Sequence, residues 1–107
     1  MRVSVGNLAD LPDGRGVQVE TAGHRIAVFR LGEAAYAIGD RCSHAEASLA
    51  EGELFETDVE CPRHGSEFNL LTGEPDSFPA TRPVPTYTVE IVDGKVFLEV
   101  EPQEDEG

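Results

Sequence analysis

The chain has 107 residues, of which 39% are hydrophobic and none is tryptophan, so we expect one domain with a core of aliphatic residues and phenylalanine. Its 21 acidic and 8 basic residues give a formal net charge of −13. Such a surface repels nucleic acids and anionic membranes and favours a basic surface on another protein, although the surplus acid is also compatible with solubility alone. Like charges also oppose self-association, which favours a monomer.

No apolar run approaches the ~20 residues of a membrane span, and the first residues, MRVSVGNLADLPDG, lack the apolar core of a signal peptide. We therefore expect a cytoplasmic protein. Because cytoplasmic thiols stay reduced, the two cysteines are expected to be metal ligands or free thiols rather than a disulfide.

The expected elements are short strands separated by turn-forming residues. Alternating or continuous apolar residues predict strands over 2–5, 16–21, 25–31, 34–40, 58–60, 67–70, 87–92 and 95–100. Asp93 and Gly94 join the last two strands, because a two-residue hairpin turn favours residues that accept positive φ. Gly52 limits any helix over 44–54 to one or two turns, and the acidic segment 101–107 is expected to be disordered. The sequence thus predicts an all-β domain over residues 1–100.

Two pairs of metal-binding side chains stand out, Cys42-Ser-His44 and Cys61-Pro-Arg-His64, each where a predicted strand passes into a loop. If the two hairpins lie side by side, the four ligands meet at one point. Thiolate and imidazole suit zinc or iron rather than magnesium or calcium. Two cysteines and two histidines complete a tetrahedral zinc site, but zinc sites usually group like ligands along the chain. One cysteine and one histidine in each loop are better suited to two metals.

The spacing C42-S-H44, sixteen residues, then C61-P-R-H64-G resembles the Rieske iron–sulfur family, in particular its small soluble ferredoxins. The resemblance implies the Rieske fold, an antiparallel β-sandwich with a small cluster-binding subdomain built from two loops, at about residues 41–82. It also implies one Rieske-type 2Fe-2S cluster, with Cys42 and Cys61 on the inner iron and His44 and His64 on the outer, solvent-facing iron.

The resemblance extends to the segments that follow the second loop. Residues 67–75, EFNLLTGEP, match the family's strand and Thr-Gly turn, and residues 77–85, SFPATRPVP, match the proline loop that covers the cluster. The family's pattern implies a cluster environment made of Ser66, Phe68, Phe78 and Pro79.

High-potential members of the family carry two further cysteines that form a disulfide clamp, and the matching positions here are Ala47 and Arg63. Because the chain lacks these two further cysteines, the resemblance favours the soluble, low-potential ferredoxins. Ser66 matches the serine that hydrogen-bonds to a cluster sulfur in high-potential relatives, whereas Phe68 replaces a tyrosine and has no hydroxyl to donate. We therefore expect a potential near the low end of the range of roughly −150 to +300 mV for Rieske centres.

Seven acidic residues lie between Cys42 and Phe68, against the single base Arg63. They predict an acidic collar around the cluster, or alternatively a set of acids that only solvate exposed strands. They are Glu46, Glu51, Glu53, Glu56, Asp58, Glu60 and Glu67. The third histidine, His24, is expected at the surface in a turn, with no second ligand beside it.

The resemblance implies a one-electron carrier without substrate chemistry of its own, and hence an electron-transfer component rather than an enzyme. Its expected donor is an NAD(P)H-dependent ferredoxin reductase, and its expected acceptor is the terminal oxygenase of an aromatic-ring-hydroxylating dioxygenase system. Three alternatives stay open. They are a Rieske ferredoxin associated with iron–sulfur cluster assembly or another acceptor, a redox sensor that keeps the cluster, and a structural zinc-binding interaction module.

Overall fold

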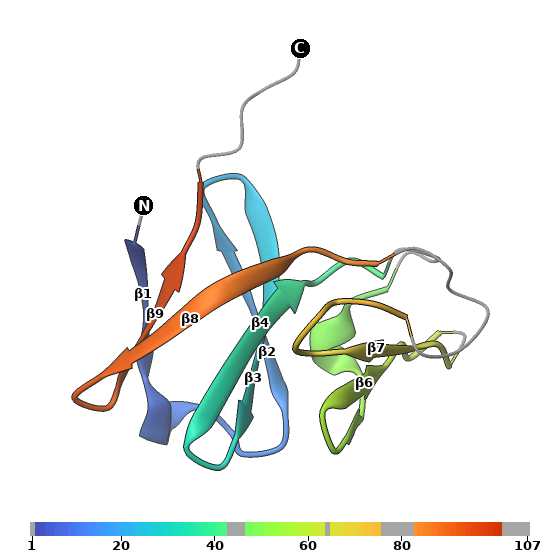
Figure 1. Cartoon of the computed structure of the whole chain (residues 1–107), viewed down its shortest axis with the longest axis horizontal. Coiled ribbons are helices and arrows are strands. Elements are labelled where there is room, and N and C mark those ends of the chain that lie inside the picture. The colour runs from blue at the N-terminus through green and yellow to red at the C-terminus, as the bar shows by residue number, and fades with distance from the viewer. Residues whose placement is uncertain (1, 43–46, 64, 76–82, 102–107) are drawn as a thin grey trace.

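The computed structural model describes residues 2–42, 47–63, 65–75 and 83–101. Within these ranges the chain is built almost wholly of short strands, as predicted (Figure 1). The elements are β1 (Arg2–Asn7), η1 (Leu8–Asp10), β2 (Gly16–Thr21), β3 (His24–Leu31), β4 (Ala34–Gly39), η2 (Leu49–Glu51), β5 (Leu54–Phe55), β6 (Asp58–Glu60), β7 (Glu67–Asn69), β8 (Thr86–Val92) and β9 (Lys95–Glu99).

The predicted strands are confirmed to within two residues at their ends. The two-residue strand β5 was not predicted, because it is too short to show alternation. The helix formers over 44–54 give only the three-residue 3-10 helix η2 among the described residues, in agreement with the limit set by Gly52. The expected disorder of the tail lies mostly outside the described residues.

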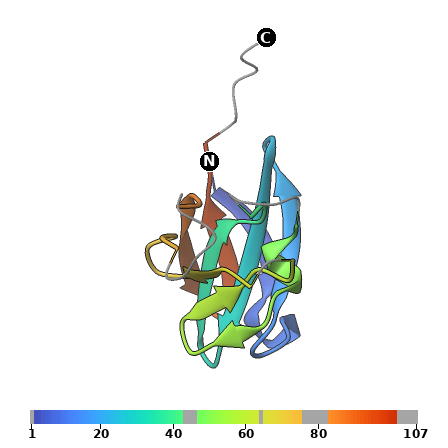
Figure 2. The same cartoon turned by 90° about the vertical axis from the view of Figure 1, so that its right-hand side faces the viewer.

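Six strands form one antiparallel sheet in the order β1-β9-β8-β4-β3-β2, and three form a smaller antiparallel sheet in the order β5-β6-β7. In the larger sheet β4 and β8 are joined by only two residue pairs, Ala37↔Tyr87 and Ile38↔Thr86. Its two halves therefore face each other across a shared apolar core, which confirms the predicted antiparallel sandwich (Figures 1 and 2).

Strand β3 is buried on both faces, which explains its continuous apolar run. Ile26 and Val28 pack toward Val96 and Leu98 of β9, in the core of the sandwich. The alternate residues of β3 point the opposite way, and Phe29 packs in a second core that the small sheet and η2 share. The small sheet is thus fixed to one outer face of the sandwich (Figure 1).

The β8–β9 hairpin has the predicted turn. Asp93 and Gly94 have φ angles of 50° and 77°, so both central residues adopt the left-handed conformation that this turn requires. Val96, Leu98 and Val100 alternate along this last segment, and all three are buried.

Candidate iron–sulfur site

The Cys61 loop connects the paired strands β6 and β7 and spans residues 61–66. The Cys61 amide donates to the carbonyl oxygen of Ser66 (2.7 Å), and the Gly65 amide donates to the carbonyl oxygen of Cys61 (3.0 Å). Gly65 has a φ angle of 77°, a left-handed conformation that residues with a side chain adopt only with strain. These bonds fix the backbone at the start of the loop, where the thiol lies.

The Cys42 loop, residues 42–47, follows the end of β4 and is closed in the same way. The Cys42 amide donates to the carbonyl oxygen of Ala47 (3.1 Å), and Arg41 and Ser48 form an antiparallel bridge just outside the loop. In both loops the cysteine amide therefore bonds the carbonyl oxygen of the residue five positions later. Each cysteine thus stands where a strand passes into a loop, as predicted.

The two loops are joined through the backbone that lies between them in the sequence. The Glu60 amide, directly before Cys61, donates to the carbonyl oxygen of Glu53 (2.8 Å). The Cys42 and Cys61 residues are 4% and 1% exposed and belong to one apolar core together with Phe68. Neither cysteine forms a disulfide.

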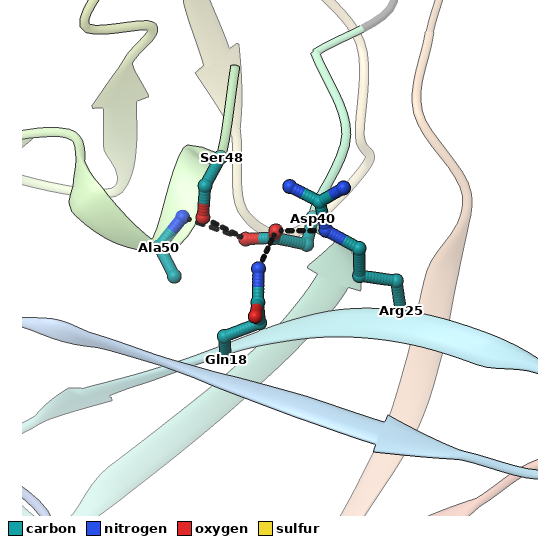
Figure 3. Close-up of polar contacts among 5 residues, drawn as sticks. All are labelled: Gln18, Arg25, Asp40, Ser48 and Ala50. Atoms are coloured by element: carbon teal, nitrogen blue, oxygen red, sulfur yellow. Dashed lines mark hydrogen bonds and ion pairs between the residues drawn. The ribbon is translucent and has the colours of Figure 1, made fainter. Parts of the chain in front are cut away.

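Asp40, directly after β4, is completely buried, and its carboxylate accepts four hydrogen bonds (Figure 3). Its Oδ1 accepts from the Ser48 hydroxyl (2.7 Å) and the Ala50 amide (2.9 Å), and its Oδ2 accepts from Gln18 Nε2 (2.7 Å) and Arg25 Nε (2.8 Å). Burial alone would raise the pKa of Asp40, but these four hydrogen bonds together hold it below its ordinary value of 3.8. The charge of this carboxylate is thus compensated inside the protein.

The residues that flank segment 76–82 are fixed near the Cys61 loop. Pro75 forms an antiparallel bridge with Phe68, and the Val84 amide donates to the carbonyl oxygen of Gly73 (2.8 Å). A Cβ atom on Gly73 would lie 2.1 Å from the carbonyl oxygen of Val84, and the φ angle of Gly73 is 76°. Only glycine fits this position, which is the glycine of the predicted Thr-Gly turn.

The structure places half of the predicted site residues. Cys42, Cys61, Ser66 and Phe68 are described, and all four are buried. The remaining predicted residues lie outside the described ranges: His44, His64, Phe78 and Pro79. The structure therefore brings the two thiols into one core.

The predicted collar is exposed only in part. Glu51, Glu53 and Glu56 are exposed, as is the base Arg63. The acids of the two paired strands are half-buried, namely Asp58, Glu60 and Glu67, and Glu46 lies outside the described residues.

The prediction for His24 is wrong in part. This residue is the half-buried first residue of β3, with Nδ1 2.9 Å from the hydroxyl oxygen of Tyr87 and Nε2 hydrogen-bonded to the carbonyl oxygen of Glu101. A carbonyl oxygen only accepts, so Nε2 of His24 donates the bond to Glu101.

Sequence reasoning missed Asp40. The signal available was an acidic residue directly after a buried apolar strand, two residues before a predicted ligand. Its four partners lie 8 to 22 residues away in the sequence, and no local pattern identifies them.

The described residues fit an iron–sulfur cluster. Two buried thiols, Cys42 and Cys61, occupy corresponding positions in two loops of like construction. Thiolates are the ligands that hold iron–sulfur clusters, and an apolar core around them limits the access of solvent. Within the described residues, no helix is long and apolar enough to cross a membrane.

Comparison with known proteins identifies the family. The family model described as the Rieske [2Fe-2S] domain matches residues 1–88. The 3-phenylpropionate/cinnamic acid dioxygenase ferredoxin subunit of Escherichia coli (strain K12) is 41% identical over 100 residues, which cover 92% of this chain and 93% of the relative.

Two solved structures share the whole fold. The ferredoxin of carbazole 1,9a-dioxygenase from Nocardioides aromaticivorans IC177 matches with a TM-score of 0.90 at 33% identity, over 94% of this chain and 99% of that one. A chain in the complex of reduced oxygenase and oxidized ferredoxin in carbazole 1,9a-dioxygenase matches with a TM-score of 0.87 at 37% identity, over 97% of both chains. The predicted Rieske fold is thereby confirmed, and a Rieske-type 2Fe-2S cluster, not zinc, is the cofactor. The chain belongs to the Rieske [2Fe-2S] family and is a ferredoxin, a carrier of electrons rather than an enzyme.

Proposed function

We propose that Cys42 and Cys61 hold one iron of the cluster and that His44 and His64 hold the other. The observation that carries this proposal is the matched construction of the two loops, each of which begins with a buried cysteine whose amide closes the loop. The histidines stand two and three residues after these cysteines in the sequence. When bound, the cluster takes up and returns one electron, and imidazole ligation of one iron raises its potential above that of an all-cysteine cluster.

The chain's own residues hold the cluster ligands and limit the access of water to it. Leu49, Val59 and Phe68 are fully buried in the core that contains both thiols. A rigid apolar surrounding lowers the reorganisation that a change of charge requires, which suits electron transfer. Ser66 is buried in the Cys61 loop, and we propose that its hydroxyl contributes to the environment of the cluster, together with Phe68, Phe78 and Pro79.

We propose further that the chain accepts electrons from an NAD(P)H-dependent ferredoxin reductase and passes them to a terminal, aromatic-ring-hydroxylating oxygenase. The relative from Escherichia coli, a dioxygenase ferredoxin subunit, supports this acceptor. The structural relative in a complex of oxygenase and ferredoxin supports it as well. The sequence prediction of a cytoplasmic monomer, with a single domain over 1–100 and a cluster-binding part at about 41–82, belongs to the same proposal.

The acidic collar gives the docking surface. Glu51, Glu53 and Glu56 are exposed on the part of the chain between the two cysteines, and the formal net charge is −13. Complementary charge raises the rate of encounter and orients the partners, more than it adds to affinity. We therefore propose that both redox partners present basic surfaces to this side of the protein.

A stopped-flow experiment tests the proposed acceptor. The reduced protein is mixed with the oxidised dioxygenase that the Escherichia coli relative serves, after removal of its own ferredoxin. We expect reoxidation at a rate that falls as salt is added. The absence of electron transfer, when the native ferredoxin reacts normally, would contradict this acceptor.

The collar is tested by removing two of its charges. Glu51→Gln with Glu53→Gln is expected to slow the bimolecular step and weaken its salt dependence, because these two exposed acids flank Gly52, which lies against Glu60 directly before Cys61. Glu33→Gln is the matched control, because Glu33 is exposed in the turn before β4, at the opposite end of that strand from Cys42. An equal effect of the control would show that net charge alone matters, not the collar.

A further inference from the structure

The two ligand loops are supported unequally. Beneath the Cys61 loop, β6 and β7 pair at three consecutive positions. Beneath the Cys42 loop there is one bridge, Arg41↔Ser48, after which the chain turns into the short helix η2. A single bridge fixes the direction of a loop less firmly than a ladder of three pairs. Some other contact is needed to hold the Cys42 loop with the same precision.

The Cys42 loop lacks the strand pairs that support the Cys61 loop, and the carboxylate of Asp40 supplies bonds in their stead (Figure 3). Oδ1 accepts from the Ser48 hydroxyl and the Ala50 amide, both on the returning side of the loop. Asp40 also bonds that side through its backbone, because its carbonyl oxygen accepts from the Leu49 amide (2.7 Å). Three bonds from one residue therefore replace the pairs that β6 and β7 make beneath the other loop.

The other oxygen of the same carboxylate is tied to the sandwich. Oδ2 accepts from Gln18 Nε2 on β2 and Arg25 Nε on β3, and the Asp40 amide donates to the carbonyl oxygen of Arg25 (3.0 Å). Both oxygens are thus engaged by donors only. Asparagine has nearly the same shape, but its NH2 group would replace one of the two oxygens. That group is a donor and would face two donors, so the hydrogen bonds on that side of residue 40 would be lost.

We infer that Asp40 is a positioning residue for the cluster: its carboxylate holds the Cys42 loop to β2 and β3 and so fixes the direction of the Cys42 ligand. This inference rests on the proposed ligand role of Cys42. Asp40 acts through Ser48 and Ala50 rather than by contact with the cluster. Its complete burial and its four charge-assisted hydrogen bonds give the rigidity that such a role requires.

Two substitutions test the inference from different sides. Ser48→Ala removes one bond between the carboxylate and the loop without any change of charge, and its matched control is Ser4→Ala on the exposed edge strand β1. Asp40→Asn keeps the shape of the side chain, and its matched control is Asp93→Asn in the β8–β9 turn. Asn-Gly suits that turn as well as Asp-Gly does, and the net charge changes equally.

The readouts are the EPR g values of the reduced cluster, the rate at which an iron chelator removes the cluster, and the midpoint of unfolding in denaturant. We expect Ser48→Ala to lose the cluster about tenfold faster or more, as the loss of one charge-assisted hydrogen bond implies. Asp40→Asn should lose it at least as fast. Both variants should shift the g values, and both controls should behave as the wild type.

Each outcome decides between the explanations. A wild-type protein without the EPR signal of mixed cysteine and histidine ligation overturns the proposed function before any variant is compared. Wild-type release rates and g values in Ser48→Ala and Asp40→Asn overturn the inference alone. Faster release with unchanged g values and a matching fall in the unfolding midpoint also overturns it, because Asp40 would then stabilise the whole fold. If Asp40→Asn does not fold, Ser48→Ala decides by the same readouts.

Discussion

The Cα of Gly52 lies so close to Glu60 that a Cβ atom on it would be 2.0 Å from the Glu60 carbonyl oxygen. This contact joins the chain just after the Cys42 loop to the chain just before the Cys61 loop. The hydrogen bond from the Glu60 amide to the Glu53 carbonyl oxygen (2.8 Å) lies beside it. The two cysteine loops are thus held side by side by backbone contacts that leave no space for a side chain.

Gly52→Ala is expected to lower the free energy of unfolding by about 1 to 3 kcal/mol, the usual range for overpacking a close contact. The φ angle of Gly52 is −76°, so the cost comes from the lack of space and not from backbone strain. Because the backbone must move, the two loops separate and the cluster is released more readily. Denaturant unfolding followed by circular dichroism and by cluster absorbance measures both effects.

Glu51→Ala, at the exposed end of η2, serves as the control for that substitution. It should leave the stability and the cluster nearly unchanged. A Gly52→Ala variant as stable as this control would mean that the contact with Glu60 relaxes without consequence for the loops.

Ser66→Ala is expected to lower the reduction potential of the cluster. The proposed hydrogen bond from the Ser66 hydroxyl to a cluster sulfur would stabilise the reduced state, and a bond of about 1 kcal/mol corresponds to ~40 mV for one electron. Spectroelectrochemical titration of the two proteins measures the difference, with Ser4→Ala as the surface control. An unchanged potential would show that the hydroxyl does not act on the cluster.

Tyr87→Phe is expected to remove about 1 kcal/mol of stability near neutral pH, since it deletes the hydrogen bond to His24 Nδ1. Burial raises the pKa of Tyr87 above its ordinary value of 10.0. The unfolded chain therefore releases this proton at a lower pH than the folded chain. The contribution of Tyr87 is fully present below pH about 10 and is lost as the pH rises through the higher, folded pKa.

Unfolding curves at neutral pH and above pH about 10 test this dependence. The difference in stability between the wild type and Tyr87→Phe should shrink on the alkaline side. If the difference stays constant across that range, the ionisation of Tyr87 is not linked to folding.

The features predicted from the sequence are those that depend on neighbours in the chain. The Asp93-Gly94 turn and the two strands that it joins were predicted because turn chemistry and alternation are local signals. The two cysteine loops were predicted for the same reason, since each hairpin is closed within a few residues of its cysteine.

The features that were missed depend on contacts between distant segments. His24 and Tyr87 are 63 residues apart, and Gln18 and Asp40 are 22 apart, so neither hydrogen bond has a local signature. The role of Gly52 was recognised only as a limit on helix length, because its close approach to Glu60 depends on how the small sheet folds back. Patterns in a single sequence predict the individual strands and turns, whereas the packing of distant segments determines which polar groups are hydrogen-bonded to one another.

The most direct test of the central claim is the EPR spectrum of the purified protein after reduction with dithionite. If the cluster is held as proposed, the protein is red-brown when oxidised, and its reduced form gives a 2Fe-2S signal with the low average g value of mixed cysteine and histidine ligation. A colourless protein without a signal, carrying one equivalent of zinc, would contradict this claim.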